Sequence, residues 1–329
     1  MRFAVLGAGG WGTAVARLLA NEGHKTSLWA RDPERAHQID ATRCNERYLP
    51  GVSLPDTLHV TANLHEVLEV EHWVFAVPSF GMAALIHRLQ AEGADCRVAV
   101  NLAKGIDRDT HYTMSELVEK AFPSAKVYTL SGPSHAEEVG RDMPTAVVLA
   151  GHDLEVGRQL QHAISTPRFR VYLSGDLRGV EWCSTIKNII AVATGVSDGL
   201  GYGDNSRGAL ITRGLAELMR FGDVVGVSNT TLFGLSGLGD LVATCTSEHS
   251  RNRGVGVRLG QGEPLEDILT DMTMVAEGVF ATGIIHEIAE EREIEMPITH
   301  AVYRLLQGNA DPLSLVNEIM TRTPKREDT

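Results

Sequence analysis

The sequence lacks the cysteine pattern of a disulfide-stapled or zinc-binding domain. Its four cysteines, at positions 44, 96, 183 and 245, lie far apart and form no Cys-x-x-Cys pair, whereas a disulfide framework or a zinc knuckle needs characteristic spacing. The 13 histidines include no His-Glu-x-x-His motif and no tight cluster along the sequence. We therefore expect reduced, structural cysteines and no metal site.

Long apolar runs are also missing. The longest ones, such as IIAV and TAVVLA, fall far short of the roughly 18 to 20 residues of a membrane-spanning helix. The chain opens on the strand-like segment FAVLGAG instead of the apolar stretch and cleavage site of a secretory signal. We expect no membrane span and a location in the cytoplasm.

An excess of positive charge is absent too. The 30 Lys and Arg residues are outnumbered by 42 Asp and Glu residues, which gives a formal net charge of -12. Nucleic-acid binding depends on Lys and Arg that neutralise phosphates, so we expect no nucleic-acid partner. An anionic ligand would have to be met by local positive charge.

The sequence does contain an alternation of strand-like and helix-like segments in its first half. This alternation predicts βαβ units and a mostly parallel sheet, with the runs from about residue 127 on as antiparallel additions whose order is left open. The strand-like runs are RFAVLG, KTSLWA, HWVFAVP, RVAVNLA, AKVYTLSG, TAVVLAG and FRVYLS. After residue 175 a period of 3.6 residues predicts helices over 207–221, 237–246, 277–291 and 297–306.

A glycine loop follows the first of these strands. Gly7, Gly9 and Gly12 have the spacing G-x-G-x-x-G between a strand and a helix. In a dinucleotide-binding loop the three glycines allow a tight turn, close approach of the backbone to a pyrophosphate, and close packing of helix on strand. The alternative is a simple βα turn, but the flanking segments favour a dinucleotide site. The predicted fold class is α/β, with an N-terminal Rossmann dinucleotide-binding domain over residues 1–175 and an all-helical substrate domain over 176–329.

Arg31 and Asp32 follow the second strand. Residues at this position determine whether a dinucleotide-binding enzyme prefers NAD or NADP. An acid there binds the ribose 2′-OH of NAD, and an arginine accommodates the 2′-phosphate of NADP. Both residues also suit a solvated turn. We interpret the pair as favouring NADPH, with NADH use possible.

Polar residues at the ends of later strands are candidates for binding an anion, because ligands of parallel sheets lie beyond the carboxyl ends of the strands. Lys104 lies in a Lys-Gly loop, and Ser134 precedes a helix that it could simply cap. Farther on, Arg251 and Asn252 lie in the basic segment HSRNRG. Arginine binds phosphate through two parallel hydrogen bonds, although a solvated basic turn is an equal alternative.

Lys187 lies in the middle of the apolar segment VEWCSTIKNIIAVATGV, residues 180–196. At helical spacing its face is small and partly polar, with Cys183, Ser184, Ala191 and Thr194 as neighbours. The lysine either extends along a surface to reach water or enters a domain cleft, where it would exchange a proton with a carbonyl oxygen during hydride transfer. The pattern leaves both alternatives open.

Taken together, the motifs resemble those of the bacterial NAD(P)-dependent glycerol-3-phosphate dehydrogenases over nearly the whole chain. The segments that carry the resemblance are GAGGWGTAVA, LWARD, AVPS, AKGI, SGPSHAEEV, EWCSTIKNIIAVATGVSDGLGYGDNSRGALITRGLAE, GLSGLGDLVATCTS, SRNRGVG and VAEGV. The family interconverts sn-glycerol 3-phosphate and dihydroxyacetone phosphate for glycerophospholipid synthesis. The resemblance also implies a Rossmann domain followed by a helical one, and makes a homodimer plausible.

The resemblance implies roles for individual residues. Lys187 is similar to the proton acceptor for glycerol-phosphate oxidation, and hence the donor for reduction. The implied substrate positions are Lys104, Gly132, Ser134, Asp240, Ser250, Arg251 and Asn252. The implied cofactor positions are Gly7, Gly9, Gly10, Trp11, Gly12, Arg31, Lys104, Ala136, Arg251, Val275 and Glu277. Gly10 departs from the family pattern, because many members carry alanine or serine there.

Two other functions fit parts of the pattern. A 6-phosphogluconate or β-hydroxyacid dehydrogenase also carries a lysine on a helix after a Rossmann domain, but the substrate motifs of those enzymes have no clear counterpart here. A cofactor-sensing binding protein would keep the Rossmann fold without turnover. Lys187 and the Ser-Arg-Asn segment at 250–252 argue against that alternative.

Overall fold

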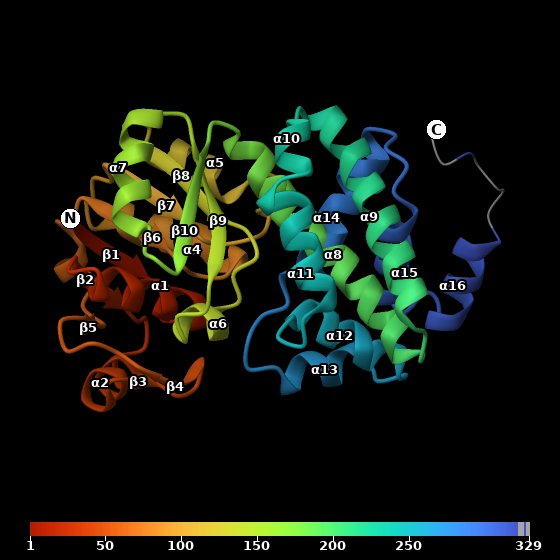
Figure 1. Cartoon of the computed structure of the whole chain (residues 1–329), viewed down its shortest axis with the longest axis horizontal. Coiled ribbons are helices and arrows are strands. Elements are labelled where there is room, and N and C mark those ends of the chain that lie inside the picture. Colours follow the sequence, from red (N-terminus) through yellow and green to blue (C-terminus); the bar gives the residue numbers. More distant parts are fainter. Residues whose placement is uncertain (322–325, 327–329) are drawn as a thin grey trace.

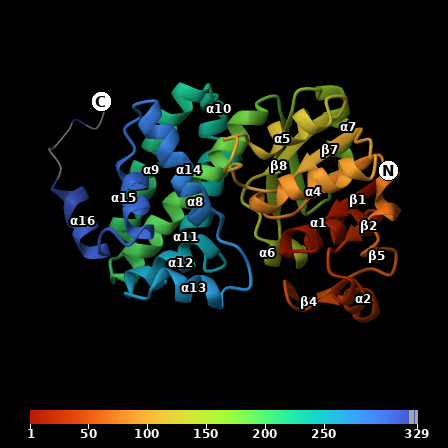
Figure 2. The ribbon, with the colours of Figure 1, turned by 180° about the vertical axis from the view of Figure 1, so that it is seen from behind.

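The chain forms two lobes, seen side by side in a computed structural model that describes residues 1–321 and residue 326 (Figures 1 and 2). The first lobe contains a sheet with helices on both sides, and the second consists of helices around a long central one. No strand follows Ser174 in the described residues. The predicted fold class is confirmed.

The first lobe is built on an eight-stranded sheet in the order β10-β9-β8-β7-β6-β1-β2-β5. All neighbouring strands are parallel except β8 and β9. The strands are β1 (Arg2–Leu6), β2 (Lys25–Trp29), β5 (His59–Thr61), β6 (His72–Phe75), β7 (Val98–Asn101), β8 (Lys126–Ser131), β9 (Thr145–Gly151) and β10 (Phe169–Ser174). A separate antiparallel pair consists of β3 (Cys44–Asn45) and β4 (Leu49–Ser53).

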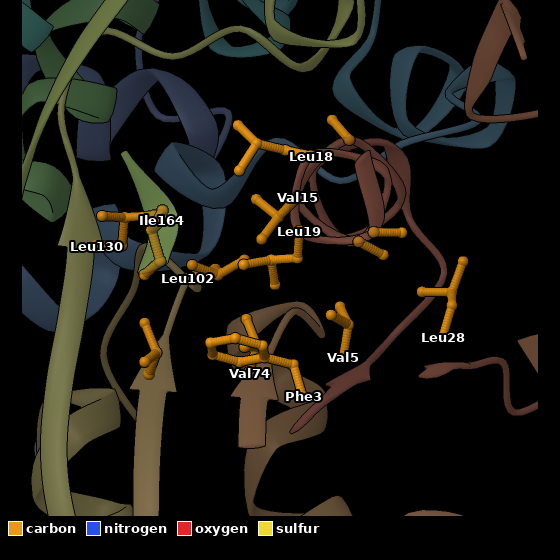
Figure 3. Packing of buried hydrophobic residues seen from close by; sticks show 14 of the residues in the cluster. Phe3, Val5, Val15, Leu18, Leu19, Leu28, Val74, Leu102, Leu130 and Ile164 are labelled. Atoms are coloured by element: carbon orange, nitrogen blue, oxygen red, sulfur yellow. The ribbon is translucent and has the colours of Figure 1, made fainter. Parts of the chain in front are cut away.

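Seven helices belong to this lobe. They are α1 (Gly10–Asn21), α2 (Pro33–Thr42), α3 (His65–Leu68), α4 (Ser79–Ala91), α5 (Met114–Ala121), α6 (Ala136–Gly140) and α7 (Leu154–Ile164). Figure 3 shows how apolar side chains of α1, among them Val15 and Leu19, pack over the sheet next to Phe3 and Val5 of β1. This packing fixes the start of α1 at the carboxyl end of β1.

The expectation of antiparallel additions after residue 127 was only partly right. The prediction was wrong for β8, which lies parallel to β7, and right for β9, which runs antiparallel to β8. A parallel neighbour needs a crossover connection, usually a helix. Helix α5 provides one before β8 and α7 before β10, whereas only the five-residue α6 separates β8 from β9. The chain therefore turns back once, at β9.

The second lobe contains α8 (Leu177–Gly199), α9 (Asp204–Val225), α10 (Asn229–Leu232), the π-helical turn η1 (Leu235–Gly239), α11 (Asp240–Thr246), α12 (Arg251–Gly260), α13 (Leu265–Asp271), α14 (Glu277–Glu291), α15 (Pro297–Leu306) and α16 (Pro312–Met320). The predicted helices 277–291 and 297–306 coincide with α14 and α15. The segment 237–246 instead divides into the end of η1 and α11. Because β10 ends at Ser174 and α8 begins at Leu177, we keep the division at residues 175 and 176 as a proposal.

Helices α8 and α12 run parallel in backbone contact. A Cβ added to Gly195 would meet the carbonyl oxygen of Arg253 at 2.1 Å, and one added to Gly256 would meet that of Val192 at 2.1 Å. Contacts this short leave room only for glycine. Helix α12 begins at Arg251. Its first turn therefore lies beside the part of α8 that follows Lys187 in the sequence.

Candidate active site at the junction of the two lobes

The glycine loop between β1 and α1 has the geometry of a dinucleotide-binding turn. Gly7 has φ +126°, and a Cβ there would meet the carbonyl oxygen of Ala76 at 2.6 Å. A Cβ on Gly12 would meet the carbonyl oxygen of Gly7 at 2.1 Å. A Cβ on Gly9, in contrast, would meet nothing within 4 Å. Gly7 and Gly12 are thus needed for the turn itself, while Gly9 borders open space.

The residues around this loop fit a dinucleotide. Gly9 is the N-cap of α1 and offers no side-chain cap, so the N–H groups of the first turn are available to an anion such as a pyrophosphate. Trp11 has a buried Nε1 atom with no hydrogen-bond partner among the described residues. Ala136 begins α6 next to the loop, where its Cβ would lie 3.5 Å from a Cβ on Gly10.

Gly10, the departure from the family pattern, has a local cause. A Cβ at this position would meet the carbonyl oxygen of Tyr48 at 2.6 Å. Tyr48 lies in the turn between β3 and β4, which here approaches the start of α1. Alanine or serine at position 10 would require this turn to shift.

Arg31 and Asp32 are placed differently after β2. Asp32 is the N-cap of α2: its Oδ1 accepts hydrogen bonds from the backbone N–H groups of Glu34 at 3.0 Å and Arg35 at 3.4 Å. Arg31 is exposed and has no side-chain partner among the described residues. The carboxylate is therefore occupied by a structural role, while the guanidinium is available to a ligand.

Lys187 is buried, with 3% of its surface exposed, and is paired. Its Nζ lies 2.9 Å from Asp240 Oδ1 and donates a hydrogen bond to Thr244 Oγ1 at 2.5 Å. Asp240 also binds Lys104, whose Nζ donates to Oδ2 at 2.8 Å. The side chain does not extend to a surface. One carboxylate thus holds two lysines, one from each lobe.

These charges shift one another's pKa values. Burial lowers the pKa of Lys187 to about 8, although Asp240 acts in the opposite direction; Lys104 lowers it further. Burial alone would raise the pKa of Asp240, but the two lysines outweigh burial and hold that pKa below its usual range. The cluster therefore contains an ionised carboxylate and a lysine that can release its proton near neutral pH.

Gly132 and Ser134 lie after β8, on the same side of the junction. The carbonyl oxygen of Gly132 accepts hydrogen bonds from Lys104 Nζ at 3.3 Å and Ser134 Oγ at 3.0 Å. Gly132 has φ +148°, and a Cβ there would lie 3.0 Å from the Cα of Val147. Ser134 does not cap α6, because the N-cap is His135. The two residues thus adjoin the lysine pair through Lys104.

Ser250, Arg251 and Asn252 form the start of α12. Ser250 is the N-cap, and its Oγ accepts a hydrogen bond from the N–H of Arg253 at 3.2 Å. Asn252 is buried, and its Oδ1 accepts a hydrogen bond from the N–H of Gly278 at 2.9 Å. Arg251 is exposed, within the electrostatic reach of Glu277. Ser250 and Asn252 thus have structural partners, whereas the guanidinium of Arg251 is available to a ligand.

Glu277 joins the two lobes. Its Oε1 accepts a hydrogen bond from the N–H of Ser79 at 2.8 Å and its Oε2 one from Ser79 Oγ at 2.5 Å. Burial raises the pKa of Glu277. The two hydrogen bonds from Ser79 and the positive charge of nearby Arg251 oppose this rise. Val275 lies in the half-buried segment just before α14. A Cβ on Gly105 would lie 3.2 Å from Glu277 Oε2, so the loop that carries Lys104 packs against this link.

Sequence reasoning missed two residues of this arrangement. Thr244 lies four residues after Asp240 on α11, so helical spacing alone places the two on one face and would have indicated it. Ser79 lies in the segment AVPS after a strand, and nothing in that segment indicates a contact with the helical lobe. Its partner Glu277 is 198 residues away, and no local pattern signals a contact at that distance.

Comparisons with known proteins identify the family to which both lobes belong. Residues 2–157 match the family described as NAD-dependent glycerol-3-phosphate dehydrogenase N-terminus, and residues 176–317 match its C-terminus. A glycerol-3-phosphate dehydrogenase [NAD(P)+] of Chlorobium limicola is 46% identical over 99% of both chains. One of Solidesulfovibrio magneticus is 47% identical over 99% of this chain and 100% of its own. The crystal structure of a Coxiella burnetii glycerol-3-phosphate dehydrogenase has a TM-score of 0.93 and 40% identity, and covers 98% of this chain.

Proposed function

From the premise that this chain belongs to the NAD-dependent glycerol-3-phosphate dehydrogenase family, we propose how its residues carry out an NAD(P)-linked dehydrogenase reaction. The substrates are sn-glycerol 3-phosphate and dihydroxyacetone phosphate. When bound at the glycine loop, NAD(P)H supplies a hydride to C2 of the ketone. Lys187 donates the proton to the C2 oxygen during reduction and accepts it during oxidation.

One observation carries the assignment of Lys187. Its Nζ is buried at the junction of the lobes, has a pKa of about 8, and is held 2.9 Å from Asp240. A general acid is most effective when its pKa lies near the working pH. Asp240 fixes the position of the ammonium group, and Lys104 adds a second positive charge that stabilises negative charge developing on the substrate oxygen.

The substrate phosphate is assigned to the start of α12. Arg251 offers a guanidinium that is free of structural bonds, and the N–H groups of the first helical turn favour an anion. Asn252 contributes its Nδ2 group, because Oδ1 is engaged by Gly278. Gly132 and Ser134 line the opposite side, and Ser250 shapes the turn. Binding energy from this remote phosphate orients the ketone toward Lys187.

For the cofactor we propose the glycine loop residues with Trp11, Ala136, Val275 and Glu277. Arg31 selects NADPH over NADH, because it is free while Asp32 caps α2. Glu277 acts through its hydrogen bonds with Ser79, which hold the start of α14 at the junction.

The experiment compares NADPH consumption with dihydroxyacetone phosphate and with unphosphorylated dihydroxyacetone. We expect a kcat/KM higher by at least roughly 100-fold for the phosphate, since hydrogen bonds to charged groups contribute about 1.5–3 kcal/mol each. Arg251→Ala should remove most of that advantage. Arg258→Ala, at the other end of α12 and paired with Glu263 and Asp271, is the control and should keep it. Equal rates for both ketones would contradict the phosphate site, and no turnover of either would favour a cofactor-sensing protein.

We also propose a cytoplasmic homodimer whose product supplies glycerophospholipid synthesis, as the family resemblance implies. Within the described residues, no helix is both long and apolar enough to cross a membrane. Analytical ultracentrifugation tests the assembly: a single species of about twice the 35.7 kDa chain mass is expected, and a monomer at micromolar concentration contradicts it.

A further inference from the structure

A cavity of ≈ 420 Å³ lies between α14, α15 and the end of α16. In Figures 1 and 2, α15 and α16 lie on the side of the helical lobe that faces away from the sheet lobe. None of the proposed active-site residues lines this cavity. Any ligand here would therefore be separate from the dehydrogenase reaction.

Three side chains that can bind a metal converge at the cavity wall. His286 and Glu290 are one helical turn apart on α14, and His300 extends from α15. The ligand atoms of the three side chains all lie within 4.8 Å of one another. None of these side chains has a hydrogen bond or ion pair to another described residue. The three residues come from two different helices, and their spacing in the sequence matches no metal-binding motif.

We propose that His286, Glu290 and His300 bind one divalent transition-metal ion and thereby tie α14 to α15. Imidazole ligands suit Zn²⁺, Cu²⁺ and Ni²⁺, whereas Mg²⁺ and Ca²⁺ prefer sites built from oxygen atoms only. Two histidines and a glutamate are also a common zinc ligand set that leaves a fourth position open for water. The cavity provides room for that water.

The geometry needs only a small adjustment. A tetrahedral ion with bonds of about 2.0–2.2 Å brings its ligand atoms to about 3.4 Å from one another. Glu290 and His300 are exposed and can close the difference by rotating their side chains. His286 is held more firmly, because its ring stacks on Tyr303 with centroids 4.1 Å apart.

The carboxylate of the site is identified by its position. The acidic residues that line the cavity are Glu290, Glu295 and Glu318, and Glu318 is paired with Arg304 at 2.6 Å. Glu290 is the acidic residue whose carboxylate oxygen lies within 4.8 Å of the ligand atoms of both imidazoles. It therefore supplies the negative charge next to the ion.

Titration of the purified, chelator-treated protein with Co²⁺ and Zn²⁺ tests the proposal. Tetrahedral Co²⁺ absorbs visible light, so one equivalent per chain should give a saturable spectrum that Zn²⁺ displaces. At a Zn²⁺ concentration 100 times its Kd, the melting temperature should rise by about 5 °C. His286→Gln and His300→Gln should each abolish the spectrum and the shift, and Glu290→Gln should weaken binding at least about 10-fold.

Two control variants test whether other histidines bind the metal ion. His24 Nδ1 lies 3.2 Å from the N-terminal amine, so this pair is a possible competing site, and His37 is an exposed helical histidine. His24→Gln and His37→Gln should retain the spectrum. Circular dichroism without metal checks that each variant folds. Absence of saturable binding in the wild type, or retention of the spectrum in both folded His286→Gln and His300→Gln variants, would overturn the proposal.

Discussion

Lys187 shows how a buried helix tolerates a charge at its centre. An unpaired ammonium group would be expensive to desolvate, but Asp240 lies 2.9 Å away and Thr244 accepts a hydrogen bond. Lys104 shares the same carboxylate, so the cluster of three ionised groups has an excess of one positive charge. That excess and burial together lower the pKa of Lys187 and make its proton transferable.

The pKa of Lys187 predicts opposite pH profiles for the two directions of the reaction. Reduction needs the protonated lysine, so its kcat/KM should be constant at lower pH and fall as the pH rises through about 8. Oxidation needs the neutral lysine and should rise over the same interval. Steady-state rates in both directions, measured from pH 6 to 10 with saturating cofactor, check this. Profiles with no change of slope between pH 7 and 9 would contradict the assignment.

Substitution of Lys187 separates proton transfer from charge. Lys187→Ala should lower kcat by roughly 10²–10⁴-fold while the dissociation constant of NADPH, followed by fluorescence, stays near the wild-type value. Lys187→Arg keeps a positive charge but cannot release a proton at these pH values, so it should be nearly as inactive. Wild-type turnover by either variant would exclude the lysine as the proton donor.

Substitution of Arg31 tests the preference for NADPH over NADH. Because the guanidinium has no partner in the described part of the chain and a bond to a charged group contributes about 1.5–3 kcal/mol, Arg31→Ala should raise the KM for NADPH roughly 10- to 100-fold. The KM for NADH serves as the internal control and should change little. An equal rise for both cofactors would mean that Arg31 does not contact the 2′-phosphate.

At the scale of elements, the parallel contact of α8 and α12 places the turn at the start of α12 that we propose to bind the phosphate. Gly256→Ala should destabilise the protein by several kcal/mol, because its Cβ would meet the carbonyl oxygen of Val192 at 2.1 Å and the helices would have to separate. Gly254 lies on the same helix with nothing within 4 Å of its Cβ position. Gly254→Ala should therefore stabilise by up to about 1 kcal/mol through helix propensity.

Urea unfolding followed by circular dichroism measures both changes. If Gly256→Ala is as stable as Gly254→Ala, the helices are not in backbone contact. Dihydroxyacetone phosphate kinetics add a second measure, since displacement of α12 moves Arg251 and should raise the KM of the Gly256→Ala variant.

Much of this architecture could be predicted from local patterns. The helices α14 and α15 and the strands β1, β2 and β6 to β10 follow from periodicity and flanking glycines. The sequence predicted a reversal but placed its start too early, at about residue 127, because strand direction depends on whether a helix crosses the sheet, and α6 is too short to be distinguished from a turn by its composition. The pair of β3 and β4 and the three-residue edge strand β5 were missed, since strands of two to five residues carry little periodicity.

The site was predictable to the extent that single residues carry its chemistry. The sequence presents Lys187 and Lys104 as unusual cations, and family motifs imply the rest. Pattern alone could not decide whether Lys187 reaches a surface, because that depends on Asp240, 53 positions later. The bond of Glu277 to Ser79 and the convergence of His286 with His300 likewise arise only when distant segments are brought together.

At the scale of the whole molecule, Glu181 of α8 is a buried link between the lobes. Its Oε1 accepts hydrogen bonds from Asn101 Nδ2 at 2.6 Å and from the N–H and Oγ of Ser115, at 3.1 and 2.9 Å. Its Oε2 has no partner among the described residues. Burial raises the pKa of Glu181 to about 7, so the folded protein holds a proton there that the unfolded chain releases at lower pH.

This proton makes stability depend on pH in a defined direction. Between the ordinary pKa of about 4.5 and the folded value of about 7, the folded state binds more protons than the unfolded state. Rising pH should therefore destabilise the protein through Glu181 by up to about 1.4 kcal/mol per pH unit within this interval. Glu181→Gln mimics the protonated group, so the stability of the wild type relative to this variant should fall from pH 5 to 7 and then level off. Parallel curves would contradict the raised pKa.

The burial of α8 has a consequence for hydrogen exchange. Most of its residues, including Lys187, are buried, and both α12 and α14 pack against it through glycines. Its central amides can exchange with deuterium only when the lobe opens as a unit, so they should be among the slowest in the chain.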